Sequence, residues 1–204
     1  FRPFATPVDL FHVVGAELQY RNFAALLQNM ENLCRDQKMA KTGSAEVPLE
    51  EIYTLMERQC GVPAKLAMEA ELQAERALLY ANPYMLAVFQ ELHKLDKRII
   101  VTSDTYFPES FVVEILERNG YDGTEKRFLS CAYQQGKYNG GLVGEIRTYL
   151  GKETSCLHIG DNTCSDVIQA KKKGFSAIYV PNVNLAGAPY RTKKQSRMTG
   201  SAYA

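Results

Sequence analysis

The sequence has little excess charge and no long apolar run. Its 24 basic and 23 acidic side chains leave a net charge of +1, which argues against nucleic acid as a partner. No stretch of 18 apolar residues is present, so we expect no transmembrane helix and no membrane insertion. Gly-x-Gly-x-x-Gly does not follow any expected strand, which makes a dinucleotide-binding oxidoreductase a weak alternative.

The five cysteines are scattered and include no Cys-x-x-Cys pair, which argues against a zinc knuckle or a redox dithiol. Their odd number and the chain length fit a reducing compartment, so we expect a cytoplasmic location. Cys164 is interpreted as a buried, inert thiol, because no positional argument supports its reactivity.

The first half of the chain has apolar residues at helical spacing almost throughout. With 46% hydrophobic residues, the 204-residue chain can form one large domain, or a core with an inserted subdomain. Helices are expected to begin at Thr6-Pro7 and to cover about 22–40, 48–59, 63–81 and 83–95. We therefore expect an all-helical cap subdomain over residues 1–95.

After residue 96 the pattern changes to short β-rich runs that alternate with helices. Expected strands are 98–103, 128–131, 156–160 and 177–180, and expected helices are 108–118, 142–150 and 165–173. Such alternation indicates right-handed βαβ units and a three-layer, Rossmann-like parallel sheet over 96–181, so the fold class is α/β. Residues 182–204 are polar and basic, and we expect them to be a solvated tail.

Three loops are expected to meet at the carboxyl edge of this sheet, where parallel sheets bind their ligands. The first holds Ser103 and Asp104, the second holds Lys137, and the third holds Asp161 with Asp166 shortly after it. A hydroxyl can hold phosphate oxygens, a lysine balances the charge of a phosphoryl group, and carboxylates bind Mg²⁺. The loops together therefore predict a phosphoryl-transfer site.

In these motifs the chain resembles the haloacid dehalogenase (HAD) superfamily of phosphatases. The second family motif corresponds to Ile99–Asp104, the third to Lys137, and the fourth to Gly160-Asp161-Asn162 with Ser165-Asp166. The segments Arg2-Pro3-Phe4 and Asp9-Leu10-Phe11 resemble the start of a bacterial branch that often lies beside or within glycosyltransferases. The resemblance extends from Phe1 to about Pro181 and implies a glycosyltransferase association.

The resemblance also implies roles for these residues. Ser103 would bind the phosphate together with Asp104, and Thr102 is the alternative if the strand is shifted by one residue. Lys137 would stabilise the phosphoryl group and the nucleophile. Asp161 would bind Mg²⁺, and Asp166 would support the metal directly or through water.

The helical segment from about 7 to 95 would be the family's cap, which closes over the site, excludes water and selects a small phosphorylated substrate. Four side chains of one expected cap helix are interpreted as a solvated face: Glu69, Glu71, Glu75 and Arg76. The three histidines, His12, His93 and His158, are interpreted as structural, because none lies on a candidate catalytic loop.

The first family motif, an apolar strand ending in Asp-x-Asp, is absent from the sequence. Its first aspartate is the family's nucleophile and its second is the general acid and base. In the related branch this motif would end shortly before Arg2, and its strand would lie between the strands at Ile99 and Leu157. We therefore expect little or no turnover by this chain alone, and a longer protein or another segment to supply the strand.

Two other readings stay open. A non-catalytic scaffold or partner domain fits the missing nucleophile, but a decayed site has no physical reason to keep Ser103, Lys137 and Asp161 together. A receiver-type phospho-acceptor domain also uses carboxylates and a lysine on a parallel sheet. The long helical region argues against it, because receiver domains are small and compact.

Overall fold

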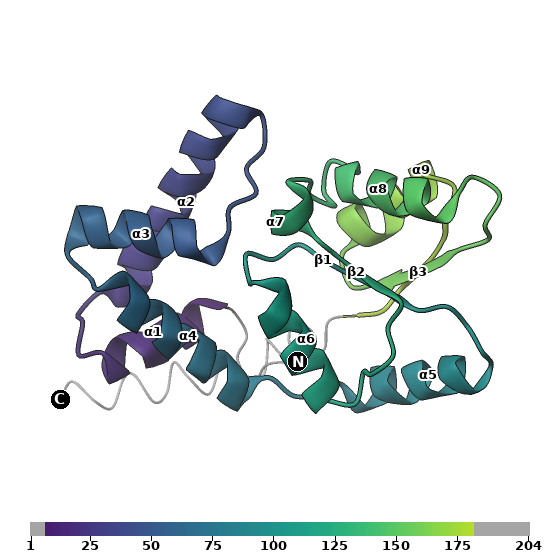
Figure 1. The fold of residues 1–204 in the computed structure, drawn as a ribbon, viewed down its shortest axis with the longest axis horizontal. Coiled ribbons are helices and arrows are strands. Elements are labelled where there is room, and N and C mark those ends of the chain that lie inside the picture. Colours follow the sequence, from purple (N-terminus) through teal and green to yellow (C-terminus); the bar gives the residue numbers. More distant parts are fainter. Residues whose placement is uncertain (1–6, 182–204) are drawn as a thin grey trace.

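The computed structural model of the chain describes residues 7–181, which begin with a layer of packed helices (Figure 1). The helices of this half are α1 (Pro7–Glu17), α2 (Phe23–Thr42), α3 (Leu49–Cys60), α4 (Ala64–Leu78) and α5 (Pro83–Lys94). The helical first half is confirmed, with ends shifted by a few residues. Helix α5 lies apart from the other four, on the side of the strands (Figure 1), and the expected end of the cap at residue 95 stays a prediction.

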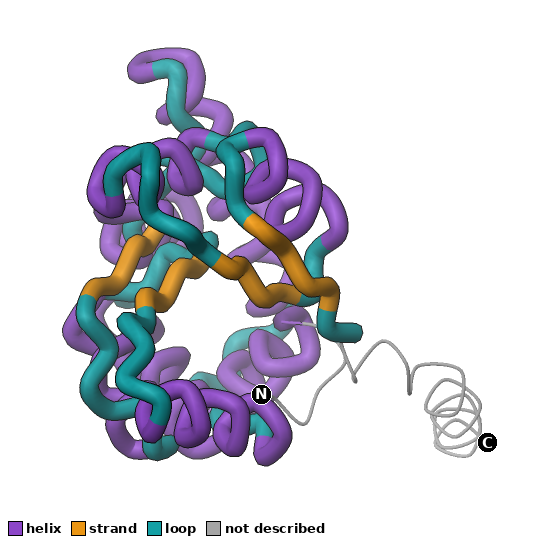
Figure 2. Tube along the Cα trace, turned by 90° about the vertical axis from the view of Figure 1, so that its right-hand side faces the viewer, coloured by secondary structure: helices purple, strands orange, loops and turns teal. Residues whose placement is uncertain are grey.

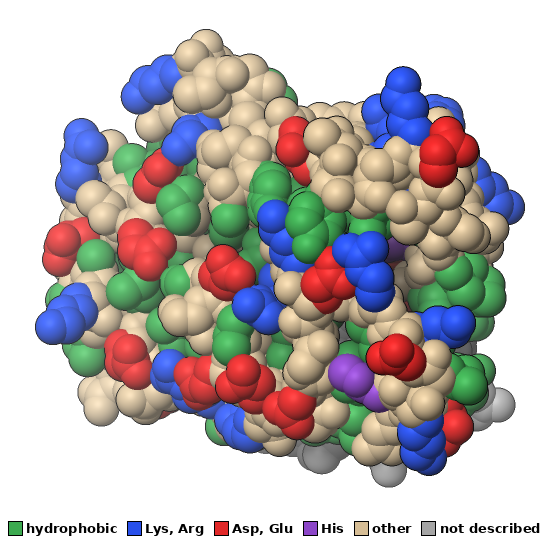
Figure 3. Space-filling view, turned by 45° about the vertical axis from the view of Figure 1, so that its right-hand side comes forward, with side chains coloured by type: hydrophobic (Ala, Val, Ile, Leu, Met, Phe, Trp, Pro, Cys, Tyr) green, Lys and Arg blue, Asp and Glu red, His purple; other side chains and the backbone are tan. Residues whose placement is uncertain are grey.

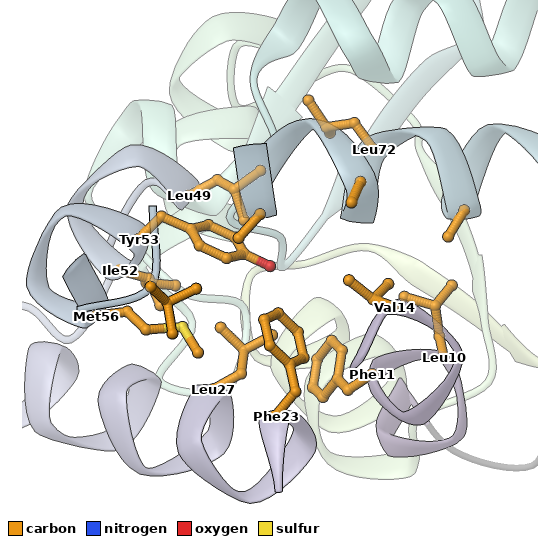
Figure 4. Close-up of a cluster of buried hydrophobic side chains, with 14 of the residues drawn as sticks. Leu10, Phe11, Val14, Phe23, Leu27, Leu49, Ile52, Tyr53, Met56 and Leu72 are labelled. Carbon is orange, nitrogen blue, oxygen red and sulfur yellow. The ribbon is translucent and has the colours of Figure 1, made fainter. Parts of the chain in front are cut away.

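Helices α1 to α4 pack around one hydrophobic cluster (Figure 4). Leu10, Phe23 and Tyr53 are almost completely buried in it. Burial of one such side chain stabilises the fold by about 1.5–3 kcal/mol. Because apolar residues at helical spacing lie on one face of each helix, these faces pack against one another. Phe107 and Phe111 belong to the same cluster although they follow the first strand. The helical layer is therefore attached to the segment after that strand.

Four short strands form two separate parallel ladders (Figure 2). They are β1 (Ile100–Ser103), β2 (Lys126–Leu129), β3 (Leu157–Gly160) and β4 (Ser176–Tyr179). In the first ladder Ser103 is opposite Leu129, and in the second Gly160 is opposite Tyr179. Within residues 7–181, β1 pairs only with β2 and β3 only with β4.

The remaining helical segments connect the strands, as the alternating pattern predicts. They are α6 (Glu109–Arg118), α7 (Ser130–Tyr133), α8 (Gly141–Leu150), the π-helical segment η1 (Thr163–Ile168) and α9 (Gln169–Lys172). A second hydrophobic cluster joins both ladders through α8, since Phe128 of β2, Leu142 of α8 and Phe175 before β4 pack together. The α/β, Rossmann-like class with a helical cap is confirmed.

Two expected elements differ in the structure. The strand expected at 128–131 ends at Leu129, and Ser130 begins α7. Ser130 is fully buried, and its hydroxyl donates to Thr105 O and accepts from Thr105 N–H, so it closes a turn onto the segment after β1 instead of extending the ladder. The helix expected at 165–173 begins earlier, at Thr163, and its first part is π-helical.

On the face shown in Figure 3, basic and acidic side chains are interspersed among hydrophobic and other side chains, which agrees with the small net charge. Among residues 7–181 no helix has the length and hydropathy to cross a membrane. The expected tail, 182–204, and the Arg2-Pro3-Phe4 pattern lie outside the described residues.

Candidate active site

Lys137 joins the loops that follow β1 and β3. Its backbone N–H donates a hydrogen bond to Asp104 Oδ1 at 2.9 Å, and its Nζ donates to Asp166 Oδ1 at 2.7 Å. Asp104 comes directly after β1, whereas Asp166 lies in η1, after β3. Residues from all three candidate loops therefore meet at the carboxyl ends of the strands.

Asp166 is held as a buried carboxylate, with 3% of its surface exposed. Its Oδ1 also lies 3.1 Å from His158 Nε2, and its Oδ2 accepts from the backbone N–H of Asn162 at 3.0 Å. Burial alone would raise the pKa of Asp166. The hydrogen bonds from His158 and Lys137, with the positive charge of Lys137, outweigh burial and hold this pKa well below its usual value. Asp166 is therefore an ionised partner for Lys137 at neutral pH.

The local sequence explains why Asp166 lies over the end of β3. A Cβ atom on Gly160 would lie 2.5 Å from Asp166 Cβ, so only glycine leaves room for this side chain. Asn162 accepts hydrogen bonds from the backbone N–H groups of Cys164 and Ser165 and so starts the helical turn that carries Asp166. The short glycine-aspartate-asparagine motif thus fixes the carboxylate.

His158, interpreted as structural, is largely buried and also contacts the candidate site. Its ring nitrogen contacts Asp166, and its side chain is 11% exposed. The period of two in a strand gives the signal that could have found it: His158 and Gly160 face the same side of β3, and Asp166 packs against that side at Gly160. Since Asp166 is ionised, His158 in its neutral form donates through Nε2–H.

Ser103 and Asp161 occupy the expected positions at strand ends. Ser103 is the last residue of β1 and is partly buried, and Asp161 follows β3 directly and is exposed. Thr102, the alternative phosphate ligand, has a buried Oγ1 that forms no hydrogen bond with the described residues. A buried hydroxyl without a hydrogen-bond partner costs roughly 1–3 kcal/mol. Cys164 is partly exposed, not buried as expected.

The carboxylates that follow β3, Asp161 and Asp166, are of a type that suits a hard cation, but they do not make a full set of ligands. Mg²⁺ prefers oxygen ligands and usually binds one or two carboxylates plus water and phosphate. Asp161 provides such a carboxylate, but both oxygens of Asp166 already have hydrogen-bond donors. Over residues 7–181 no three His, Cys, Asp or Glu side chains gather in a way that could hold a metal ion. The direct role expected for Asp161 and the supporting role expected for Asp166 in metal binding therefore stay predictions.

The expectation that the cap-helix side chains face solvent is wrong for two of the carboxylates. Glu71 and Glu75 of α4 are buried, with 0% and 1% exposed. Glu71 accepts hydrogen bonds from Tyr53 OH at 2.5 Å and from Tyr106 OH at 2.8 Å. Burial together with the nearby Glu71 raises the pKa of Tyr53, so this phenol remains a donor. Glu71 thereby links α3 to the segment after β1.

Several solved structures of haloacid dehalogenase-type enzymes are similar to this chain. A 2-haloacid dehalogenase from Pseudomonas syringae pv. Tomato is similar over 86% of this chain and 80% of its own, with a TM-score of 0.61 and 14% identity. The HAD-hydrolase YfnB from Bacillus subtilis, solved bound to magnesium, is similar over 84% and 79%, with a TM-score of 0.56 and 10% identity.

A HAD-family enzyme from Bacteroides thetaiotaomicron matches 84% of this chain and 83% of its own, with a TM-score of 0.55 and 17% identity. No family model and no curated protein matches the sequence. The likeness to these solved structures, with TM-scores of 0.55 to 0.61, identifies the fold: the chain has the fold of the haloacid dehalogenase (HAD) superfamily.

Proposed function

We propose that this chain is the larger part of an Mg²⁺-dependent phosphomonoester hydrolase that acts on a small metabolite such as a sugar phosphate. The observation that carries the proposal is Lys137, which bonds at once to Asp104 after β1 and to Asp166 after β3. The Lys137 ammonium is held at the carboxyl ends of both ladders, beside the end of β1 that carries hydroxyl side chains. A positive charge in this position suits a tetrahedral phosphate dianion.

In this proposal each residue has a distinct task. Ser103, with the loop at Asp104, binds phosphate oxygens. Lys137 has two N–H groups left after its bond to Asp166, and these stabilise charge on the phosphoryl group and on the nucleophile. Asp161 holds Mg²⁺, which when bound supplies charge neutralisation at the phosphate. His158 and Asp166 keep the Lys137 ammonium in place.

The nucleophile requires a further strand, because no Asp-x-Asp occurs in the sequence. We propose that this strand lies between β1 and β3 and ends in the attacking carboxylate. In support, β1 and β3 each pair on one side only among the described residues, and Thr102 Oγ1 lacks a partner there. Leu157 of β3 is 54% exposed, which is unusual for a large apolar residue in the middle of a parallel sheet.

The test is to produce the chain alone and the chain together with the upstream segment of its gene, each with Mg²⁺. Phosphate release from p-nitrophenyl phosphate and from a panel of sugar phosphates is then measured, with chloride release from 2-chloropropionate as a comparison. We expect phosphate release only from the longer protein, and loss of that activity in Asp161→Asn. A folded longer protein that is inert on every phosphate ester, or that acts only on the haloacid, would overturn the proposal.

The second candidate is a non-catalytic partner domain, for example one that accompanies a glycosyltransferase. The absence of Asp-x-Asp favours it. The upstream codons decide between the two functions: an apolar run ending in aspartate favours the hydrolase, and a strand without a carboxylate favours the partner domain.

A further inference from the structure

The loop between α2 and α3, residues 43–48, lies across the carboxyl ends of β1 and β2. At one end, Ser44 Oγ donates a hydrogen bond to Gln134 O, in the loop that carries Lys137, at 2.9 Å. At the other end, the backbone N–H of Leu49 donates to Tyr106 O, in the loop after β1, at 2.9 Å. The two attachments place the cap loop above the edge where the candidate site lies.

Glu46, in the middle of this loop, reaches the residue next to Lys137. Its Oε1 lies 3.0 Å from the position that a Cβ atom on Gly136 would occupy. Its backbone N–H donates to Ser44 Oγ at 3.2 Å, so the same serine that ties the loop to Gln134 also orients Glu46. The cap therefore contributes a carboxylate beside the lysine loop.

This carboxylate is half-buried and forms no hydrogen bond or ion pair with any residue in the described part of the chain. A partly desolvated carboxylate without a partner is unfavourable, and it accepts a donor strongly when one arrives. A second anion brought close to it would be repelled. The part of the site beside Lys137 suits the phosphate group of a substrate. The Glu46 carboxylate, which comes from the cap, therefore suits the end of the substrate opposite the phosphate.

We propose that Glu46 is a specificity residue. It binds a hydrogen-bond donor, an ammonium or a hydroxyl group, on the alcohol part of a small phosphomonoester, and it disfavours substrates with a second anionic group. The inference rests on the proposed phosphatase function and adds the class of substrate.

The test uses the longer protein with Mg²⁺ and four esters that differ in one group. O-phosphoethanolamine carries an ammonium group, 2-hydroxyethyl phosphate a hydroxyl, ethyl phosphate no donor, and phosphoglycolate a carboxylate. Glu46→Gln should lower kcat/KM for O-phosphoethanolamine relative to ethyl phosphate by roughly tenfold or more, because a hydrogen bond to a charged group is lost. The loss for 2-hydroxyethyl phosphate should be smaller, and the ratio for phosphoglycolate should rise.

Glu17→Gln is the matched control, since it makes the same charge change at an exposed end of α1 and should leave all four ratios unchanged. Ratios that stay within about twofold of the wild type in Glu46→Gln refute the role of Glu46, while hydrolysis of ethyl phosphate leaves the phosphatase function standing. Calorimetry with 2-aminoethylphosphonate and ethylphosphonate tests the same preference without turnover. If neither phosphonate binds and no ester is hydrolysed, the proposed function fails, and this inference fails with it.

Discussion

Gly160→Ala is the substitution that tests the geometry of the site most directly. The new Cβ would lie 2.5 Å from Asp166 Cβ and closer still to its Cγ and Oδ2. Carbon atoms in folded proteins do not approach this closely, and Asp166 belongs to a short turn fixed by Asn162. The side chain must therefore rotate away from the end of β3.

The cost follows from what Asp166 loses by rotating. Its carboxylate accepts from Lys137 Nζ, His158 Nε2 and the Asn162 N–H, and hydrogen bonds to a charged group are each worth about 1.5–3 kcal/mol. Forcing an extra methyl group into packed surroundings costs about 1–3 kcal/mol. Because the turn can relax and keep part of these contacts, we expect a total loss of about 3 kcal/mol.

Urea unfolding followed by circular dichroism measures this loss. With a slope of about 2 kcal/mol per molar urea, the midpoint should fall by roughly 1.5 M. Gly144→Ala is the control: Gly144 is inside α8, where a Cβ would lie an ordinary 3.6 Å from Lys173 Nζ. Alanine there should stabilise the chain by about 0.5–1 kcal/mol. If Gly160→Ala unfolds at the wild-type midpoint, Asp166 does not pack on Gly160 and the site as described is wrong.

Further substitutions test the ion pair, the metal ligand and the cap. Lys137→Met should abolish phosphatase activity of the longer protein and lower chain stability by about 2 kcal/mol, because the buried Asp166 loses one charged donor; steady-state rates and urea unfolding measure both. Asp161→Asn should abolish Mg²⁺-dependent turnover with little change in the unfolding midpoint, because Asp161 is exposed. The pKa of Asp166 is lower in the folded chain than its unfolded-state value of about 3.9, so the ionised carboxylate stabilises the fold above that pH. This contribution is lost as the pH falls below that value. Asp166→Asn should therefore flatten the acid side of a curve of stability against pH. Tyr53→Phe should cost about 1.5–3 kcal/mol in urea unfolding, because it removes a donor from the buried Glu71 carboxylate.

The candidate site was accessible to sequence reasoning because its parts are local. A strand followed by a short polar loop fixes where a side chain emerges, and the carboxyl ends of parallel strands share one edge. Asp104, Lys137 and Asp166 each follow a strand closely, and they are the residues that make contact. The contact of His158 is harder to predict, because it depends on Asp166 packing over Gly160, which shares a face of β3 with His158.

The burial of the cap carboxylates was outside the reach of the sequence. An amphipathic reading assigns glutamates of a helix to solvent, and it is correct for Glu69. Glu71 is buried because two tyrosines reach it from positions 18 and 35 residues away in the sequence, Tyr53 in α3 and Tyr106 after β1. Both donors come from other elements, so the sequence of α4 alone does not identify them.

Among the described residues, no strand of one ladder is hydrogen-bonded to a strand of the other. Phe128 of β2 and Phe175, the residue before β4, belong to one hydrophobic cluster with α8, and the Lys137–Asp166 pair lies at the carboxyl ends of the strands. The ion pair connects the loop that carries Lys137 to the segment after β3. A strand that enters between β1 and β3 would bring its last residue beside Lys137 only if it runs in the same direction as these two strands. In the proposed arrangement, the added strand would run parallel to β1 and β3 and would carry the nucleophile at its carboxyl end.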